Sequence, residues 1–292
     1  MELIKVSVSI PGTLSSNFIQ IGDVVTYKTG NISFSDSKPV ELIVEGPLDS
    51  GDVMFFRELC GGGDVLSKRF KRYVEILDLS RAMFVSCDSH YFTSKNDFYT
   101  AYHKTKSRTI TSFMFAKLKL HKVILPSDIT TIESNAFFGS FIPNIIFPDD
   151  VLLLQQESLC NCGIESISIN AKTILQKSFS MCTNLSEIKI GEKVKHINGA
   201  FSYNIKLRSV EVAKENKYLK IQNHCLLNSA GTQLILHAQK SECEKLIIPE
   251  GVEVIGEWAF YNLKKLESVS FPNSLKRIDS HAFCQCSELR EA

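Results

Sequence analysis

The feature that most constrains this chain is a repeat of about 22 residues. Phenylalanine or leucine recurs in steps that are mostly 20 to 23 residues long, at Phe115, Phe137, Leu159, Phe179, Phe201, Phe260 and Phe283. A second ladder of aliphatic residues has steps of 22, 22, 21, 22, 36 and 23, at Val123, Ile145, Ile167, Ile188, Val210, Leu246 and Val269. A unit of this length cannot bury its own apolar face, so two ladders with one period predict a stack of similar units.

Within each unit the sequence predicts one short strand followed by a tight return. An alternating [VI]-x-[IVLF] pattern is typical of a strand with one buried face. In four units a proline ends this strand, because proline cannot donate to a continuing ladder; these are Pro126, Pro148, Pro249 and Pro272. Cys162, Cys182 and Cys286 each lie three residues after a member of the Phe ladder. We interpret them as buried, reduced structural residues in the turn, in preference to metal ligands or nucleophiles.

Two inserts interrupt the period. One lies near residues 84–108 and carries "CDSHYFTSKNDFYTAYHKTKSR", which is aromatic and basic. The other lies near residues 213–240, where two apolar runs flank "NSAGT". A glycine-containing loop between apolar runs predicts a β-hairpin there.

Residues 1–65 do not follow the period and are expected to form a capping segment of strands plus one helix. "LIKVSVSI" and "VELIVEG" alternate as strands do. Asp49 or Ser50 is expected to cap a helix that runs to Leu59, with Asp52 in its first turn. Repeat arrays need an atypical end unit to cover the first open face. The expected organisation is therefore a cap over 1–65 and a solenoid of about seven or eight units over 66–292.

The repeat resembles the BspA-like leucine-rich repeat family, which occurs on surface and secreted proteins of anaerobic bacteria and some protists. The residues that carry the resemblance are "LHKVILPSDITTIESNAFFGS", "CEKLIIPEGVEVIGEWAFYNL" and "LESVSFPNSLKRIDSHAFCQCSEL". The segment before the repeats resembles its counterpart in gut-bacterial members. The resemblance implies a β-rich α/β fold, a right-handed leucine-rich-repeat solenoid, and protein binding or adhesion outside the cell. It implies no catalytic residues and no cofactor.

Composition excludes several function classes. The formal net charge is +1, so no overall field steers the chain to nucleic acid. The sequence holds no uninterrupted run of 18 apolar residues, so no membrane-spanning segment is expected. The histidines are scattered without metal-binding spacing, and no carboxylate pair or Ser-His-Asp order stands out. We therefore expect no metal, no cofactor and no enzyme activity.

The expected function is a protein-binding or adhesion module, secreted or displayed at the cell surface. The side chains that flank the buried strand positions should face outward, and Ile124 and Ile146 should lie side by side as an apolar patch, with Lys122 and Asn144 beside them. The insert adds aromatic residues that are able to grip a peptide or stack on a sugar. The candidate partner-binding residues are Lys122, Ile124, Asn144, Ile146, Tyr91, Phe92, Tyr99 and Tyr102.

Two alternatives remain open at this point. One is a carbohydrate-binding or carbohydrate-active protein that uses the aromatic insert. The other is a self-assembling scaffold, because by register Leu289 opens a further strand and the array is expected to end with an uncovered edge. A homodimer through that end, or a poorly ordered last unit, is the expected consequence.

Overall fold

The computed structural model describes residues 2–21, 24–27, 32–33, 39–61, 74–95, 100–197, 199–238 and 243–290. The contacts divide the chain into two compact units, Met1–Val151 and Leu152–Ala292. The boundary expected near residue 65 lies outside the described residues, so it stays a prediction. Among the described residues, no helix combines the length and apolar character that crossing a membrane requires.

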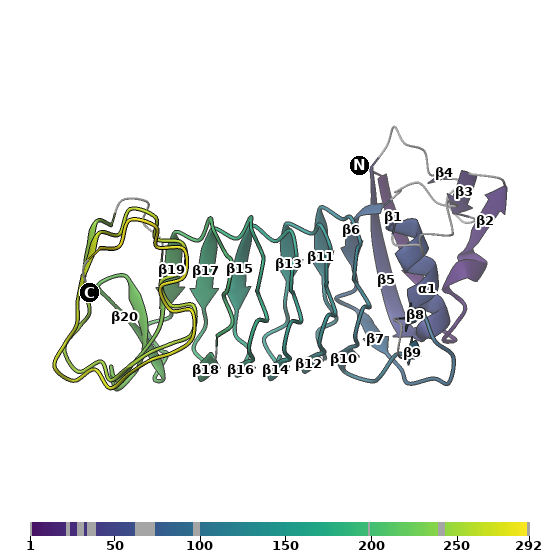
Figure 1. Cartoon of the computed structure of the whole chain (residues 1–292). Helices are drawn as coiled ribbons and strands as arrows, with labels where there is room; N and C mark the ends of the chain where they lie inside the picture. Colours follow the sequence, from purple (N-terminus) through teal and green to yellow (C-terminus); the bar gives the residue numbers. More distant parts are fainter. Residues whose placement is uncertain are drawn as a thin grey trace. The chain divides into compact units, whose positions relative to one another are not determined.

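The first unit is organised around one sheet that joins the N-terminal segment to the first repeats (Figure 1). β1 pairs with β5 in parallel, β5 pairs in turn with β6, and β6 pairs with β11, which pairs with β13. A short strand, β7, also pairs with β5. The strand bounds are β1 Glu2–Ser7, β5 Val40–Leu48, β6 Val74–Asp78, β7 Ala82–Phe84, β11 Lys122–Ile124 and β13 Asn144–Ile146. The predicted cap therefore adds its own strands to the sheet of the repeats.

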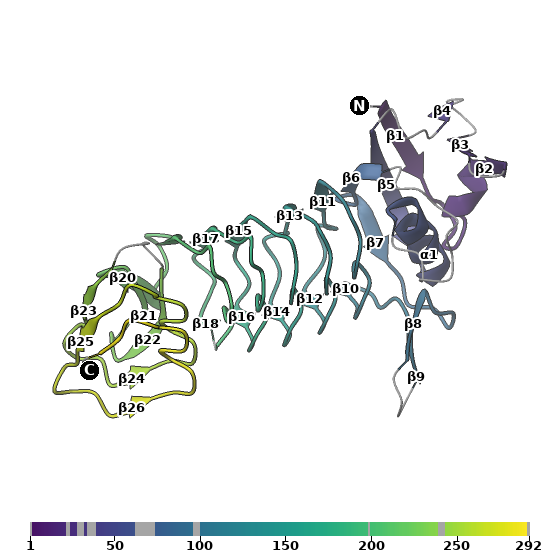
Figure 2. The same cartoon turned by 45° about the horizontal axis from the view of Figure 1, so that its top comes forward.

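Smaller elements surround this sheet. The helix α1 spans Ser50–Leu59, as the Asp49 cap and the apolar pattern predict. The 3-10 turn η1 precedes a small antiparallel sheet, and a second antiparallel pair forms the aromatic insert (Figure 2). β10 and β12 form a parallel pair on the return path of the first repeats. The bounds are η1 Leu14–Asn17, β2 Phe18–Ile21, β3 Val24–Tyr27, β4 Ile32–Ser33, β8 Phe92–Lys95, β9 Thr100–His103, β10 Thr109–Ile110 and β12 Thr131–Ile132.

The second unit continues the repeat with two parallel stacks. In the larger stack Ile167 pairs with Ile188, which pairs with Val210, as the sequence ladder predicts. Short strands form a second ladder on the return path. The bounds are β15 Ser166–Ile169, β17 Glu187–Ile190 and β19 Ser209–Val212, then β23 Lys245–Ile247 and β25 Ser268–Ser270, then β14 Leu153–Leu154, β16 Thr173–Ile174 and β18 His196–Ile197.

The insert of the second unit is a three-stranded antiparallel meander, visible in Figure 2. The predicted hairpin around "NSAGT" is confirmed, because β21 and β22 are antiparallel and residues 229–232 connect them. The preceding strand β20 was not predicted. β22 then continues in parallel into the repeat strands β24 and β26. The bounds are β20 Leu219–Gln222, β21 Cys225–Asn228, β22 Gln233–His237, β24 Val254–Ile255 and β26 Arg277–Ile278.

Within each unit the members of the Phe ladder form a column of stacked side chains, which are buried except for the half-buried Phe283. The rings of Phe115 and Phe137 lie 4.9 Å apart and 7° from parallel. In the second unit the Phe179–Phe201 and Phe260–Phe283 pairs lie 5.2 Å and 4.8 Å apart. The structure adds a member that the sequence analysis missed. His237 lies 23 residues before Phe260, its ring centroid is 5.6 Å from that of Phe260, and its backbone N–H donates to the carbonyl of Ala259.

The backbone turns around this column are unusual. The residues two before and two after each ladder position have a positive φ, although most are not glycine. Around Phe179, for example, Lys177 has φ 58° and Met181 has φ 59°. This left-handed backbone is disfavoured for a residue with a Cβ. Hydrogen bonds between neighbouring turns compensate, since the N–H groups of Lys177, Phe179 and Met181 each donate to a carbonyl of the next repeat.

The cysteines of the turns occupy the structural positions that the sequence predicts. Cys162 and Cys182 are buried, Cys286 is half-buried, and all three are free thiols. The Cys182 Sγ donates to the carbonyl of Leu159 at 3.1 Å, and the Cys286 Sγ donates to that of Phe260 at 3.2 Å. Burial raises the pKa of the Cys182 thiol well above its usual value. The thiols of Cys182 and Cys286 therefore join successive repeats, and burial raises the pKa of Cys286 as well.

Candidate partner-binding surface

The strand face of the first unit brings the predicted residues together in the predicted register. On β11 and β13, Lys122 lies beside Asn144, and Ile124 lies beside Ile146. Lys122 and Ile124 are half-buried, whereas Asn144 is exposed and Ile146 is 47% exposed. Alternation explains this arrangement, because the residue between each pair, Val123 or Ile145, points into the core.

This surface extends onto the neighbouring strand. Ile76 of β6 lies beside Lys122, and Asp78 lies beside Ile124. Ile76 and Asp78 are both half-buried. We name the set "the isoleucine face"; it consists of Ile76, Asp78, Lys122, Ile124, Asn144 and Ile146. It presents three aliphatic side chains bordered by one cation, one carboxylate and one amide.

The equivalent positions of the second unit are mostly polar. The larger stack carries serines, charged residues and no aliphatic side chain at these positions: Ser166, Ser168, Glu187, Lys189, Ser209 and Glu211. The smaller stack has one exception, Ile247, which is 69% exposed. A cluster of aliphatic side chains therefore distinguishes the strand face of the first unit from that of the second.

The aromatic insert is largely packed against its own unit. Tyr91 is 5% exposed, and its hydroxyl lies 2.6 Å from the Thr111 Oγ1 and donates to the carbonyl of Ser112. Burial raises the pKa of Tyr91. Its buried ring and bonded hydroxyl place Tyr91 in the core, so we leave it out of the candidate surface.

Phe92 is half-buried and packs against side chains of its own unit. Its ring stacks on that of Phe113 with centroids 5.5 Å apart, and the Arg57 guanidinium lies 5.1 Å from its centroid. Arg57, which is itself 4% exposed, donates to the carbonyls of Phe113 and Met114 at 2.7 Å each. Burial of this arginine could not be predicted from the residues alone, because a basic residue in the last turn of a helix is ordinarily solvated.

Tyr102 is the insert aromatic that faces outward. It is 63% exposed, and its ring meets that of His90 edge-on with centroids 5.0 Å apart. Tyr99, the remaining predicted residue, lies outside the described residues. Of the three predicted insert aromatics that the structure describes, Tyr102 therefore offers the most accessible surface.

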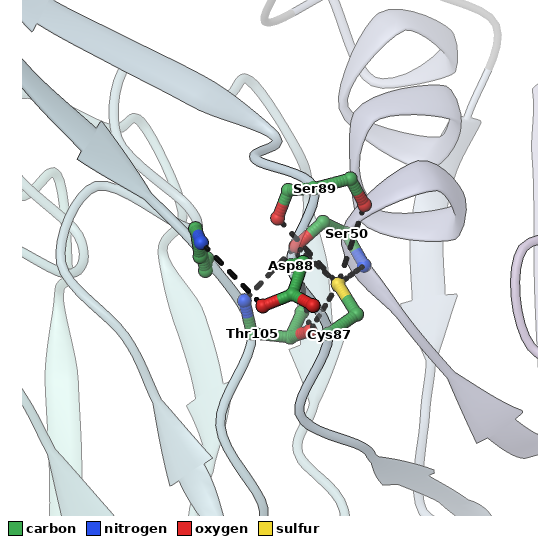
Figure 3. A network of polar contacts seen from close by, with 6 residues as sticks. Ser50, Cys87, Asp88, Ser89 and Thr105 are labelled. Carbon is green, nitrogen blue, oxygen red and sulfur yellow. Dashed lines mark hydrogen bonds and ion pairs between the residues drawn. The ribbon is translucent and has the colours of Figure 1, made fainter.

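A polar network fastens the insert to α1 (Figure 3). The Cys87 Sγ lies within hydrogen-bonding distance of Ser50, Ser89 and Thr105, and it accepts from the backbone N–H of Ser50 at 3.4 Å. Burial raises the pKa of Cys87, but hydrogen bonds from Ser50, Ser89 and Thr105 outweigh burial and lower it overall. The Thr105 N–H donates to the Ser50 Oγ at 3.0 Å. The arrangement anchors both ends of the insert at the start of the helix.

Two further observations concern metal ions and cavities in the part of the chain that the structure describes. There, no group of three histidine, cysteine or acidic residues is placed to hold a metal ion. A small cavity in the second unit has a volume of about 10 Å³. This volume is too small for an organic substrate.

Comparison with known proteins gives a consistent result. The model of the BspA-type leucine-rich repeat region matches residues 108–232 and 237–292, in six copies. A solved leucine-rich repeat protein from Eubacterium ventriosum is similar with a TM-score of 0.61 at 14% identity, over 92% of this chain and 69% of that one. The pneumococcal vaccine antigen PcpA is similar with a TM-score of 0.52 at 14% identity, over 94% of this chain and 69% of that one. At such identities the structural likeness concerns the fold. A search of curated proteins returned no match.

Proposed function

This chain belongs to the BspA-type leucine-rich repeat family, and from that premise we propose that it is a non-enzymatic protein that binds a protein partner through the isoleucine face. Repeat proteins of this kind present extended surfaces to partners. The observation that supports the proposal is the exposure of neighbouring isoleucines on an ordered sheet. Ile124 and Ile146 lie side by side on β11 and β13.

The chemistry of the face suits a protein partner better than a glycan. Aliphatic side chains gain free energy by excluding water, at roughly 25 cal/mol for each Å² of apolar surface buried. Sugars are gripped by aromatic planes and convergent hydrogen bonds, which this face does not offer. Lys122 and Asp78 lie next to the isoleucines, on β11 and β6, and charges beside an apolar contact set the orientation of a partner.

We place the protein outside the cell, secreted or displayed at the surface. The family's occurrence on surface and secreted proteins supports this location, and one similar structure is named a vaccine antigen. Antibodies against the chain should therefore label intact, unpermeabilised cells of the source organism. Labelling that requires permeabilisation would contradict the proposed location.

The binding proposal is tested by a matched pair of variants. Ile146 and Ile247 are each the third residue of a three-residue repeat strand, and both are exposed. The unmodified chain is screened against surface proteins, matrix proteins and glycans, and each partner found is measured by titration. We expect Ile146→Glu to weaken the affinity for a protein partner by about tenfold or more, as a substitution at an interface hot spot does. Ile247→Glu should change affinity by less than about twofold.

The outcomes separate the candidate functions. Equal affinity of Ile146→Glu and the unmodified chain for every protein partner would remove the isoleucine face from the proposal. Binding restricted to glycans and abolished by Tyr102→Ala would support the carbohydrate alternative instead. Circular dichroism of both isoleucine variants controls for loss of fold.

A further inference from the structure

The second unit contains two buried polar atoms that lack a partner and line one small cavity. Among the described residues, the Asn204 Nδ2 and the His237 Nδ1 are buried and make no hydrogen bond. Asn204 is 3% exposed and His237 is 5% exposed. Both line the cavity of about 10 Å³, together with Phe201, Leu207, Trp258 and Tyr261. Buried polar groups of this kind are rare and require an explanation.

The orientation of the Asn204 amide follows from its other contact. The Asn204 Oδ1 accepts from the backbone N–H of Cys182 at 3.1 Å. A backbone N–H is a donor, so the atom that faces it must be the oxygen, and the amide cannot be rotated to exchange its two ends. The Nδ2 therefore remains a donor without an acceptor.

His237 reaches the cavity because it replaces phenylalanine in the Phe ladder. Its backbone makes the hydrogen bond typical of a ladder position, to the carbonyl of Ala259 at 2.8 Å. Its ring packs near that of Phe260. A phenylalanine in this place would have no polar atom, whereas the imidazole brings a nitrogen that needs a partner. Burial lowers the pKa of His237 to about 4, so the ring is neutral at physiological pH.

The polar groups of the aromatic wall are already bonded and do not compete for the cavity. The Trp258 Nε1 donates to the Glu257 Oε1 at 3.2 Å. The Tyr261 hydroxyl donates to the Gln285 Oε1 at 3.0 Å. The two unpartnered nitrogens are thus the polar groups of the lining that need a ligand.

We propose that this cavity binds one neutral hydroxyl oxygen, supplied by an ordered water molecule, which bridges the Asn204 Nδ2 and the His237 Nδ1. One hydroxyl both accepts and donates, so it is able to accept from the amide and to donate to the imidazole Nδ1 in the tautomer that carries its proton on Nε2. A volume of about 10 Å³ corresponds to a single water. An anion without a proton could not donate a hydrogen bond to the His237 Nδ1. A cation would be repelled by the N–H group of the Asn204 amide.

The site joins the insert to the preceding repeat within the second unit. His237 is the last residue of β22, while Asn204 belongs to the turn that follows Phe201. The adjoining rings of Tyr203, Trp258 and Tyr261 lie with centroids 4.8 to 5.6 Å apart. The bound oxygen would therefore fix the position of β22 beneath this aromatic cluster.

A crystal structure at about 1.5 Å resolution, grown without polyols, tests the proposal. We expect an isolated density peak within about 3.2 Å of both nitrogens, the usual limit for a hydrogen bond. A second crystal soaked in glycerol distinguishes the source of the oxygen. If the peak in the soaked crystal becomes continuous with density for carbon atoms, the bound oxygen is a hydroxyl of glycerol instead of water, and the proposed hydroxyl site stands. An empty cavity, or a direct contact between the two nitrogens, would overturn the proposal.

Two variants supply a second readout. His237→Phe restores the ladder residue and removes one partner, and we expect the peak to disappear. His224→Asn is the control, because His224 is exposed on the same insert and has a positive φ that asparagine tolerates; the peak should persist. The chain has a single tryptophan, Trp258, so its fluorescence shows whether the aromatic cluster is intact in each variant. Retention of the peak in folded His237→Phe would show that the imidazole does not hold the oxygen.

Discussion

At the scale of single residues, the turns beside the Phe ladder place ordinary side chains in a backbone conformation that favours glycine. Lysine, methionine, tyrosine and tryptophan all adopt a positive φ there, as at Met181 and Trp258. Each such residue costs roughly 1–2 kcal/mol relative to a right-handed conformation. The stacking of rings and the hydrogen bonds between turns must offset this cost in every repeat.

The first prediction concerns this cost directly. Met181 has φ 59° and is 48% exposed, and we expect Met181→Gly to be more stable than Met181→Ala by about 1 kcal/mol. Met54 on α1 is also 48% exposed and serves as the matched control. There the order should reverse, with alanine more stable than glycine by about 1 kcal/mol. Urea unfolding of the four variants measures both differences. The same order at both sites would contradict the argument.

The second prediction concerns pH. The pKa of His237 is lowered to about 4 in the folded state, mainly by burial and further by the nearby His224, whereas an unfolded histidine has a pKa of about 6.5. Above pH 6.5 both states are neutral at this residue and it adds no pH dependence. As the pH falls from about 6.5 to about 4, the unfolded state takes up a proton that the folded state does not. The free energy of unfolding should therefore decrease, by on the order of 3 kcal/mol.

Unfolding titrations at several pH values measure this slope. His237→Phe should flatten it between pH 4 and pH 6.5. Replacing the exposed His121 with glutamine should leave the slope in place. An unchanged slope in His237→Phe would show that other groups carry the acid sensitivity.

The sequence predicts these residues unevenly, for physical reasons. The ladder members and their burial follow from period and apolarity. His237 was missed, although its distance of 23 residues from Phe260 fits the period, because a histidine carries no apolar signal. The positive φ values were also missed, since lysine and methionine have no preference for that conformation. Contacts between neighbouring repeats impose it.

At the scale of elements, one acidic residue of α1 accepts hydrogen bonds both from its own helix and from a neighbouring turn. The Asp52 carboxylate accepts from Asp49 N at 3.0 Å, which completes a capping box with Asp49. It also accepts from Gly12 N and Leu14 N at 2.7 Å each. One buried side chain thus satisfies three backbone donors and joins the helix to the turn that contains η1.

The third prediction follows from this arrangement. Asp52→Ala should lower the free energy of unfolding by at least about 2 kcal/mol, because it leaves buried N–H groups unbonded. Asp88→Ala is the control, since that carboxylate is solvent-exposed and pairs with Lys104 at 3.9 Å. It should leave stability unchanged within error. Chemical unfolding measures both, and equal stability of the two variants would contradict the assigned role of Asp52.

Element boundaries were predictable where local chemistry determines them. The capping pattern at Asp49 indicated the start of α1, and the glycine-containing loop indicated the β21–β22 hairpin. β20 and the β8–β9 hairpin were not predicted, because their strands are only four residues long, too short for an alternation of apolar and polar residues to stand out. For the candidate site, period and alternation gave the pairing of Ile124 with Ile146. They gave no indication that Tyr91 is buried, because burial of the insert depends on Thr111 and Ser112 across the unit.

At the scale of the whole molecule, the repeat architecture buries its apolar residues by stacking each repeat of about 22 residues on the next. Aliphatic residues on the return strands show this clearly: Ile132, Leu154, Ile174 and Ile255 have no exposed surface, and Ile197 is 3% exposed. Ile278 occupies the same position on β26 but is 45% exposed. In the described residues β26 pairs with β24 alone, so its outer edge carries no neighbouring strand.

The fourth prediction is that residues 1–292, produced alone, self-associate through this edge of β26. Unpaired strand edges with exposed aliphatic residues tend to pair with another copy. Light scattering over a dilution series should give a mass above that of the monomer that decreases on dilution. Ile278→Glu should be monomeric throughout, whereas Ile205→Glu, at a residue that is also 45% exposed, should behave as the unmodified chain. A monomer at every concentration would contradict the prediction.

The hydrogen bonds between turns also have a direction. In the second unit the alternate N–H groups of the turn around Phe260, those of Trp258, Phe260 and Asn262, donate to carbonyls of the next repeat, which belong to Ser280, Ala282 and Cys284. The turns around Leu159 and Phe179 donate in the same sense. Aligned peptide groups add their dipoles, as they do in a helix. The column of turns therefore has an electrical polarity, opposite in sense to that of a helix, with its positive end at the C-terminal repeat.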